Sequence, residues 1–272
     1  NYTLAAFTST ANITAKQLTV SGITASNKNY DRSRTAVVQG GSAELSGVIS
    51  GDIVTVGTSS ITGLFDTALV GTNKTVQIAG VTISGADAGN YVVVQPTAVA
   101  SISTKTITVS GVTASNKEYD ALRTATVSFG SATISGIETG DAVQLDITGV
   151  TAQFANKSIG VNKDVTITGL ALSGANAANY QVVYKRQTAN ITAKQLTATN
   201  ITAANKEYDR GVTATLALGS AGLDGVIAGD NVSIVTSSAT GAFASKTVAN
   251  GKTVTVSGLS LSGGDAANYT LA

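Results

Sequence analysis

The chain repeats itself with a fixed period of 89 residues, and this period constrains its fold more than any other feature. The phrase GADAGNY at 85–91 returns as GANAANY at 174–180 and as GGDAANY at 263–269. A unit of this length is within the usual range of a small domain and is too long for a solenoid repeat. The sequence therefore predicts a tandem array of domains.

The ends of the sequence fall within the repeated phrase. The five residues NYTLA both begin and end the 272 residues, and no Met is present, so we expect part of a longer chain. We expect residues 1–12 to be the closing strand of a preceding repeat. The modules are then expected at 13–101, 102–190 and 191–272, the third lacking the end of its closing strand.

Composition excludes several classes of chemistry. The chain has no Cys, His, Met or Trp, so it offers no disulfide, no thiolate nucleophile, no zinc–sulfur site and no histidine base. A net charge of +1 with 12% charged residues lacks the basic surface of a nucleic-acid-binding protein. No run of about 18 apolar residues occurs, so we expect no membrane insertion. We expect neither an enzyme nor a tightly bound cofactor.

Strand signals run through every repeat. The stretches QLTVSGITA, TVQIAGVTISG and YVVVQ are rich in Val, Ile and Thr, alternate in polarity, and stop at Gly, Asn or Asp. No stretch has a helical period over an ordinary helix length. The pattern predicts an all-β chain of three small β-sandwich-like modules, with an open barrel as the alternative. The joints lack a flexible spacer, so we expect the modules to form an elongated rod.

The buried face changes parity at glycines. Val76 and Ile78 share one face of a strand, whereas Val81 and Ile83 have the opposite parity, which requires a bulge or a tight turn. The residues expected to supply a positive φ there are Gly80, Gly169 and Gly258. The first strand of each module makes the same change at Gly22, Gly111 and Asn200. A hairpin turn is expected at Asn73, Asn162 and Gly251.

The repeated phrase itself is expected to form a turn between two strands. Asp87, Asn176 and Asp265 are expected to bond their own backbone in Asx-turns. Tyrosines are expected to anchor the adjoining strands, each with a buried ring and a paired hydroxyl. These anchors are Tyr91, Tyr180 and Tyr269 in the phrase, and Tyr30, Tyr119 and Tyr208 in the motif NKxYD.

Acidic residues could instead bind calcium. The candidates are Asp31, Asp52, Asp87, Asp120, Asp141, Asp209, Asp230 and Asp265. No stretch has the closely spaced acidic loop of a known calcium motif, and the second repeat has Asn176 at one of the positions. Capping of turns is the favoured role of these carboxylates.

Two lysine positions recur in each repeat. Lys28, Lys117 and Lys206 are expected to pair with the Asp of NKxYD while their stems pack on the Tyr ring. Lys16, Lys105 and Lys194 lie near the first strand of each module, and Asn90, Asn179 and Asn268 near the last. Such pairs can form isopeptide bonds beside a buried acid, but surface lysine is the favoured interpretation.

The order of NKxYD, a central GD, GADAGNY and ITAKQLT resembles the YDG/MBG-type repeats of very large bacterial surface proteins, including filamentous-haemagglutinin-like adhesins exported by two-partner secretion. The resemblance covers nearly the whole chain. It implies secretion, an extracellular or cell-surface location and a role as stalk, and it carries no catalytic residues. The chain departs from the triplet at its Gly, which is replaced by Arg32, Ala121 and Arg210. A special backbone role of that Gly would require a differently built turn here.

Two functions follow from these observations. The leading hypothesis is a structural stalk or spacer of a bacterial adhesin or extracellular fibre, whose partners are the neighbouring repeats. The alternative is a module that binds surface glycans or matrix multivalently through exposed loops at Phe65-Asp66, Phe154-Ala155 and Phe243-Ala244. The N-terminal strand is expected either to be frayed or to pair end to end with the incomplete third module of another copy. The alternative is that both ends are only cuts in a longer chain.

Overall fold

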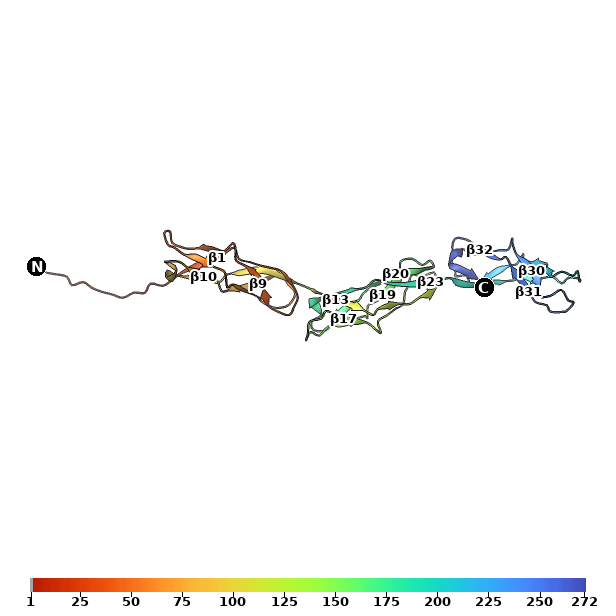
Figure 1. Ribbon diagram of the computed structural model, residues 1–272, viewed down its shortest axis with the longest axis horizontal. Coiled ribbons are helices and arrows are strands. Elements are labelled where there is room, and N and C mark those ends of the chain that lie inside the picture. The colour runs from red at the N-terminus through yellow and green to blue at the C-terminus, as the bar shows by residue number, and fades with distance from the viewer. Residues whose placement is uncertain (1) are drawn as a thin grey trace. The chain divides into compact units, whose positions relative to one another are not determined.

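The computed structural model describes residues 2–272 and consists of short strands and three single-turn 3-10 helices (Figure 1). No α-helix occurs in these residues, so the all-β prediction is confirmed. Within the same range, no helix has the length and apolar character needed to cross a membrane. Each helical turn, η1 (Ala88–Asn90), η2 (Ala177–Asn179) and η3 (Ala266–Asn268), lies in the repeated phrase.

The strands follow the same order in each repeat. Those of the first repeat are β1 (Lys16–Ser21), β2 (Thr24–Ala25), β3 (Lys28–Asn29), β4 (Thr35–Ala36), β5 (Val38–Gln39), β6 (Glu44–Ser46), β7 (Thr55–Gly57), β8 (Thr62–Phe65), β9 (Gly71–Ala79), β10 (Thr82–Ser84), β11 (Tyr91–Val93) and β12 (Thr97–Ser103). Those of the second repeat are β13 (Lys105–Ser110), β14 (Thr113–Ala114), β15 (Lys117–Glu118), β16 (Val127–Ser128), β17 (Thr133–Ser135), β18 (Gln144–Asp146), β19 (Thr151–Phe154), β20 (Gly160–Thr168), β21 (Ala171–Ser173), β22 (Tyr180–Tyr184) and β23 (Gln187–Thr192). Those of the third are β24 (Lys194–Thr199), β25 (Thr202–Ala203), β26 (Thr213–Ala214), β27 (Leu216–Ala217), β28 (Gly222–Asp224), β29 (Ser233–Val235), β30 (Thr240–Phe243), β31 (Val254–Ser257), β32 (Ser260–Ser262) and β33 (Tyr269–Leu271).

The chain forms two compact units, and the division passes through the second repeat. Unit 1 comprises 1–108, 134–145 and 172–183, and unit 2 comprises 109–133, 146–171 and 184–272. Unit 1 therefore contains the first repeat and the part of the second that adjoins it. Unit 2 contains the rest of the second repeat with the third. The join between successive repeats lies inside a unit in both cases.

In unit 1, the largest sheet of the first repeat has the strand order β3-β12-β9-β8-β4. Strand β1 pairs in parallel with β11 and then antiparallel with β6. Alternate side chains of the strands point inward, so Leu18, Phe65 and Val76 are fully buried. The same core continues from the first repeat into the second, where it includes Ile107 and Tyr180.

In unit 2, the second repeat contributes the sheet β15-β23-β20-β19, the equivalent of the large sheet of the first repeat. The third repeat contributes the sheets β28-β24-β33 and β26-β30-β31. Strand β24 again pairs in parallel with the last strand, β33, and antiparallel with β28. Phe154 and Leu196 are fully buried in their respective repeats. Each repeat is thus built on the same small sandwich-like plan.

The change of parity at Gly80 is a corner at which the chain leaves one sheet for another. Strand β9 pairs with β8 and β12, whereas β10, after the corner, pairs with β7. Gly80 has φ +83°, and a Cβ there would lie 2.4 Å from the carbonyl oxygen of Ser60. The positive φ expected at all six parity positions is confirmed. Glycine is needed here for both conformation and space.

The hairpin expected at Asn73 and Asn162 is wrong. Both residues lie inside long strands, β9 and β20, with φ of 51° and 50°. The pairing of β9 with β12 shifts register between Ala100 and Ile102, which marks a β-bulge. A positive φ was correctly inferred from the sequence, but a bulge needs the same backbone conformation as a hairpin turn.

Successive repeats are joined by one residue, because β12 ends at Ser103 and β13 begins at Lys105. Ala193 occupies the corresponding place between β23 and β24. The module boundaries expected after residues 101 and 190 fall inside β12 and β23. At the other end of unit 1, residues 2–15 contain no strand, and the side chains of Leu4 and Ile13 are completely exposed.

Candidate functional site: a tyrosine–carboxylate junction between repeats

The aspartate of each Gly-Asp loop accepts a hydrogen bond from the tyrosine of the repeated phrase. Tyr91 Oη donates to Asp52 Oδ2 at 2.5 Å, and Tyr180 Oη donates to Asp141 Oδ2 at 2.6 Å. Tyr269 Oη donates to Asp230 Oδ2 at 2.6 Å. Each ring is buried, as the sequence predicted for these three anchors. The tyrosine therefore fixes the carboxylate of its own repeat.

A side chain of the repeated phrase also binds the backbone of the residue that follows the Gly-Asp pair. The side chain of Asp87 accepts a hydrogen bond from the Ile53 N–H at 2.8 Å, and that of Asn176 accepts one from the Ala142 N–H at 3.0 Å. The expected Asx-turns are thus wrong, because these side chains bind a loop 34 residues away. Asp and Asn serve equally because only an acceptor oxygen is required.

We call the Gly-Asp loop and the phrase together the carboxylate face of a repeat.

The motif NKxYD forms a second face, beside the end of the closing strand β12. The Tyr30 N–H donates to the Ser103 carbonyl of β12 at 2.9 Å, so the closing strand positions this tyrosine. Asp31 Oδ1 accepts hydrogen bonds from the Ser33 N–H at 2.8 Å and from Lys28 Nζ at 2.7 Å. We call this turn, with the loop that includes Val70, the tyrosine face of a repeat.

In unit 1, the tyrosine face of the first repeat meets the carboxylate face of the second. Tyr30 Oη donates to Asp141 Oδ2 at 2.9 Å, so two tyrosines from different repeats share one carboxylate oxygen. Their rings meet edge to face, with centroids 5.4 Å apart. The Val70 N–H donates to Asn179 Oδ1 at 3.1 Å across the same join. Asn179 is buried, with 4% of its surface exposed.

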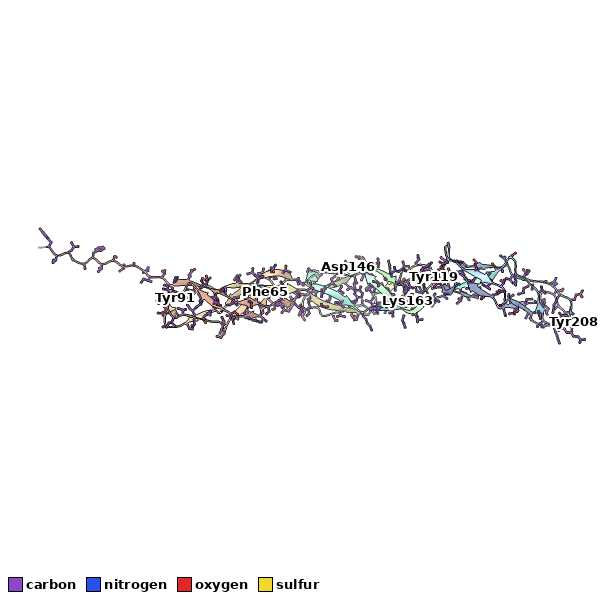
Figure 2. The ribbon with its side chains drawn as sticks, turned by 90° about the horizontal axis from the view of Figure 1, so that it is seen from above. Phe65, Tyr91, Tyr119, Asp146, Lys163 and Tyr208 are labelled. Atoms are coloured by element: carbon purple, nitrogen blue, oxygen red, sulfur yellow. The ribbon has the colours of Figure 1, made fainter. Side chains whose placement is uncertain are left out.

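Unit 2 contains the same junction between the second and third repeats. Tyr119 Oη donates to Asp230 Oδ2 at 2.9 Å, and its ring lies 5.4 Å from that of Tyr269. The Ile159 N–H donates to Asn268 Oδ1 at 3.1 Å. Figure 2 labels Tyr119, which is 1% exposed. The two junctions agree in every one of these contacts.

The buried carboxylate is compensated by a cation from the preceding repeat, but from a different position in each junction. Arg32 Nε lies 3.0 Å from Asp141 Oδ1, an oxygen that is buried and accepts no hydrogen bond in the described residues. In the second junction Lys157 Nζ lies 3.5 Å from Asp230 Oδ1. Ala121 occupies the position equivalent to Arg32 in the second repeat. A buried carboxylate requires such a partner.

Burial of the junction favours the neutral form of its tyrosines. Removal from water raises the pKa of Tyr119, Tyr180 and Tyr269 to about 12, and the neighbouring carboxylates contribute in the same direction. The hydrogen bond from Tyr269 lowers the pKa of Asp230. In the second junction, two protonated phenols therefore donate to a carboxylate that stays ionised.

The copies of these residues that no second repeat covers within residues 2–272 provide an internal comparison. Asn90, unlike Asn179 and Asn268, is exposed. Tyr208 is 59% exposed, so the anchor predicted from the sequence is wrong at this position (Figure 2). The asparagine of the phrase and the tyrosine of NKxYD are thus buried only where a second repeat covers them. The junction therefore accounts for their burial.

The calcium candidates are engaged by other groups. Asp52, Asp141 and Asp230 accept tyrosine hydroxyls, whereas Asp87 and Asp265 accept backbone N–H groups. Asp31, Asp120 and Asp209 pair with lysines. Among residues 2–272, no three side chains of Asp, Glu, His or Cys gather closely enough to hold a metal ion.

The recurring lysines have partners in part different from those expected. Lys28, Lys117 and Lys206 pair with the Asp of their motif, as predicted. However, the ring beneath Lys28 is that of Phe65, 5.6 Å from Nζ, and not that of tyrosine. Lys105, an isopeptide candidate, pairs with Glu138. Its candidate partner Asn179 uses its amide oxygen in the junction.

Two of the three phenylalanines expected in glycan-binding loops lie in the core. Phe65 and Phe154 lie on β8 and β19 and are completely buried, so they belong to the core. In β8, Gly63 faces inward beside Phe65, and a Cβ there would lie 2.5 Å from the Val38 side chain. Glycine inside a strand resembles a turn in sequence, which explains the error.

The turn after Tyr-Asp keeps a left-handed residue although the chain lacks Gly there. Arg32, Ala121 and Arg210 have φ of 63°, 61° and 66°. This conformation costs a residue with a Cβ about 1 kcal/mol.

We expect Ala121→Gly to raise the free energy of unfolding by about 0.5 to 1 kcal/mol, measured by urea denaturation. Ala114→Gly, in extended β14, is the control and should lower it. Destabilisation by both changes would contradict the strained turn.

A comparison with protein families identifies the three repeats as copies of one domain. The family model described as YDG domain matches residues 14–99, 103–189 and 192–272. No curated protein matches the chain, and no solved structure does.

Proposed function

The chain belongs to the YDG domain family, and we propose that its three repeats form a stalk that sets the distance between other parts of a secreted or cell-surface bacterial adhesin or extracellular fibre. The observation that carries this proposal is the recurrence of the junction. The tyrosine face of one repeat docks on the carboxylate face of the next in both junctions, so the contact is head to tail. A head-to-tail contact that does not close on itself propagates without limit.

The contacts of the junction suit a spacer that resists bending. A single residue joins the flanking strands, and the join is fixed by two hydroxyls on one carboxylate, a ring contact and an asparagine bond. These polar contacts are directional, whereas an apolar contact alone would allow the repeats to slide. The function proposed is therefore mechanical, and the partners of each repeat are its neighbours.

Solution scattering tests the stalk. A single globule of this length would have a radius of gyration of about 19 Å. Three repeats of about 12 Å each, spaced about 35 Å apart, would give on the order of 30 Å. We expect the larger value, extrapolated to infinite dilution. A radius below about 22 Å would contradict the proposal.

A further inference from the structure

The first and the last strands of the first repeat lie side by side and run in the same direction. Strand β1 pairs in parallel with β11, beginning with Lys16 opposite Tyr91. Strand β3 pairs in parallel with β12, which is the last strand of the repeat. We call residues 16–29 the opening segment and residues 91–103 the closing segment. The two segments therefore lie start beside start and end beside end.

Side chains add hydrogen bonds between the two segments. Asn27 Oδ1 accepts the Ser101 N–H at 2.7 Å. Ser103 Oγ donates to the Lys28 carbonyl at 3.2 Å. The contact of the opening and closing segments, which we call the clamp, thus consists of directional bonds at both ends of the repeat.

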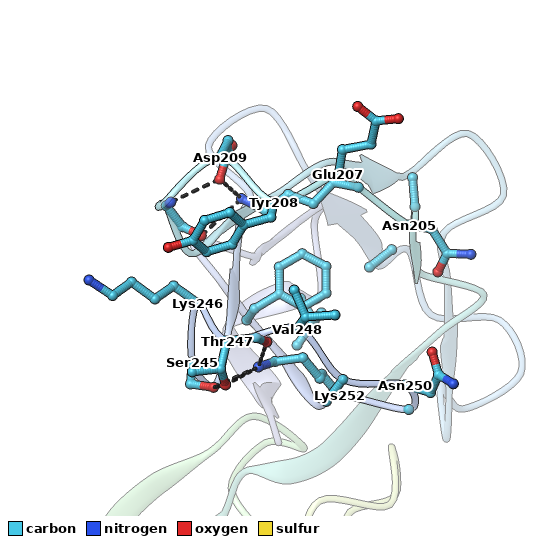
Figure 3. Close-up of a pocket in the computed structure, with 18 residues that line it drawn as sticks. Asn205, Glu207, Tyr208, Asp209, Ser245, Lys246, Thr247, Val248, Asn250 and Lys252 are labelled. Atoms are coloured by element: carbon cyan, nitrogen blue, oxygen red, sulfur yellow. Dashed lines mark hydrogen bonds and ion pairs between the residues drawn. The ribbon is translucent and has the colours of Figure 1, made fainter.

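The clamp recurs along the chain. In the second repeat β13 lies beside β22, and β15 pairs in parallel with β23. Asn116 Oδ1 accepts the Asn190 N–H at 2.7 Å, which is the equivalent of the asparagine bond in the first repeat. In the third repeat β24 pairs in parallel with β33. Figure 3 labels the third copy of this asparagine, Asn205, in the same segment as Tyr208 and Asp209. The clamp therefore gives the asparagine of NKxYD a role.

The chain enters and leaves the first repeat at opposite ends of the clamp. Ala15 precedes β1, and Thr104 follows β12. A pull along the chain is therefore applied to the start of the opening segment and to the end of the closing segment. Because the segments are parallel, such a pull slides one along the other, and the hydrogen bonds between them bear the load together. A pull on the starts of both segments would instead break the bonds one after another.

We propose that the repeats bear tension along the chain, and that the clamp is the contact that must break before a repeat unfolds. Both segments also contribute side chains to the core, where Leu18 and Ile102 are buried. Sliding of the segments must therefore draw apolar side chains out of the core while it breaks the hydrogen bonds.

This role goes beyond the proposed stalk, because a spacer that only sets a distance need not resist a pull. The clamp lies within one repeat, whereas the stalk depends on the docking of one repeat on the next. Failure of the clamp would leave the radius of gyration in solution unchanged, and failure of the docking would leave the clamp of a single repeat unchanged.

Single-molecule pulling in two attachment geometries tests the clamp. The chain contains no Cys, so pairs of introduced cysteines define the points of load. Ala15→Cys with Thr104→Cys loads the first repeat from end to end and slides the segments. Ala15→Cys with Gly89→Cys loads the starts of both segments, and a Cβ at Gly89 meets no atom within 4 Å. We expect the first geometry to require at least about twice the unfolding force at the same loading rate. Equal forces in the two geometries would overturn the proposal.

A matched pair of variants tests which bonds bear the load. Asn27→Ala removes an acceptor between the two segments, so we expect it to accelerate unfolding under a constant end-to-end load by about 10-fold. Gln95→Ala is the control, because Gln95 lies in the closing segment but bonds to Val81, outside the clamp. Gln95 Oε1 accepts the Val81 N–H at 3.0 Å, and Gln95 Nε2 donates to the Val81 carbonyl at 2.9 Å.

Urea denaturation without load should show that both variants fold and that Gln95→Ala loses at least as much stability as Asn27→Ala. Under load, Gln95→Ala should change the unfolding rate by less than about 2-fold. Equal acceleration by both variants, or none by Asn27→Ala, would overturn the clamp.

Discussion

Asp141→Ala should lower the free energy of unfolding of unit 1 by about 3 to 5 kcal/mol, because it removes the centre of a buried network. The change leaves the hydroxyls of Tyr30 and Tyr180 without their acceptor. It also leaves Arg32 without its carboxylate. Urea denaturation followed by circular dichroism measures the loss.

Asp52→Ala is the matched control for this prediction. Asp52 occupies the same position of the first repeat and accepts the hydroxyl of Tyr91 from its own repeat. It has no tyrosine of a preceding repeat among the described residues, so we expect a loss of about 1 to 2 kcal/mol. The difference between the two variants measures the contact between repeats. Equal losses would show that the junction adds nothing to the bond within a repeat.

Alkaline pH should open the junctions before it disrupts the rest of the fold. Tyrosine ionises near pH 10 in an unfolded chain, whereas burial raises the pKa of Tyr119, Tyr180 and Tyr269 to about 12. The folded state therefore holds its protons more tightly, and stability is fully present below about pH 10 and is lost from pH 10 to 12. The loss is on the order of 2 kcal/mol for each of these tyrosines.

The ultraviolet absorbance of tyrosinate, recorded with circular dichroism during a pH titration, checks this expectation. We expect ionisation of the junction tyrosines to coincide with a loss of tertiary structure near pH 11 to 12. The variant Tyr180→Phe should remove one late-ionising group and make the chain less sensitive to alkali. Ionisation of all the tyrosines near pH 10 in a chain that remains folded would contradict the buried junction.

The repeat plan of the molecule follows directly from its sequence. The period of 89 residues, the strand composition and the parity change at Gly80 are local patterns, and each identifies a structural feature without knowledge of distant contacts. The left-handed backbone at Asn73 was also predictable, but its setting was not. A bulge and a hairpin turn both require a positive φ at one residue, and they differ only in the strand that lies opposite.

The junction could not be predicted because its partners are far apart in the sequence. Tyr30 and Asp141 are separated by 111 residues, so the bond joins one repeat to the next and not residues of one repeat. A strict repeat gives every copy of a residue the same sequence neighbours, and it hides which copy each one contacts. One sequence difference did bear on the site. The first repeat has Asp87 where the second has Asn176, and this difference favours a hydrogen-bond acceptor over a metal ligand.

Amide hydrogen exchange at three equivalent positions tests the junction most directly. The Val70 and Ile159 N–H groups donate across the two junctions, to Asn179 and Asn268. The N–H of Val248, their counterpart in the third repeat, makes no hydrogen bond within residues 2–272, and the residue is 85% exposed.

If tyrosine and carboxylate faces hold successive repeats together, Val70 and Ile159 should exchange at least about 100-fold more slowly than Val248. Comparable exchange at all three positions would show that the repeats are joined only by the chain, and would contradict the docking of one repeat on the next.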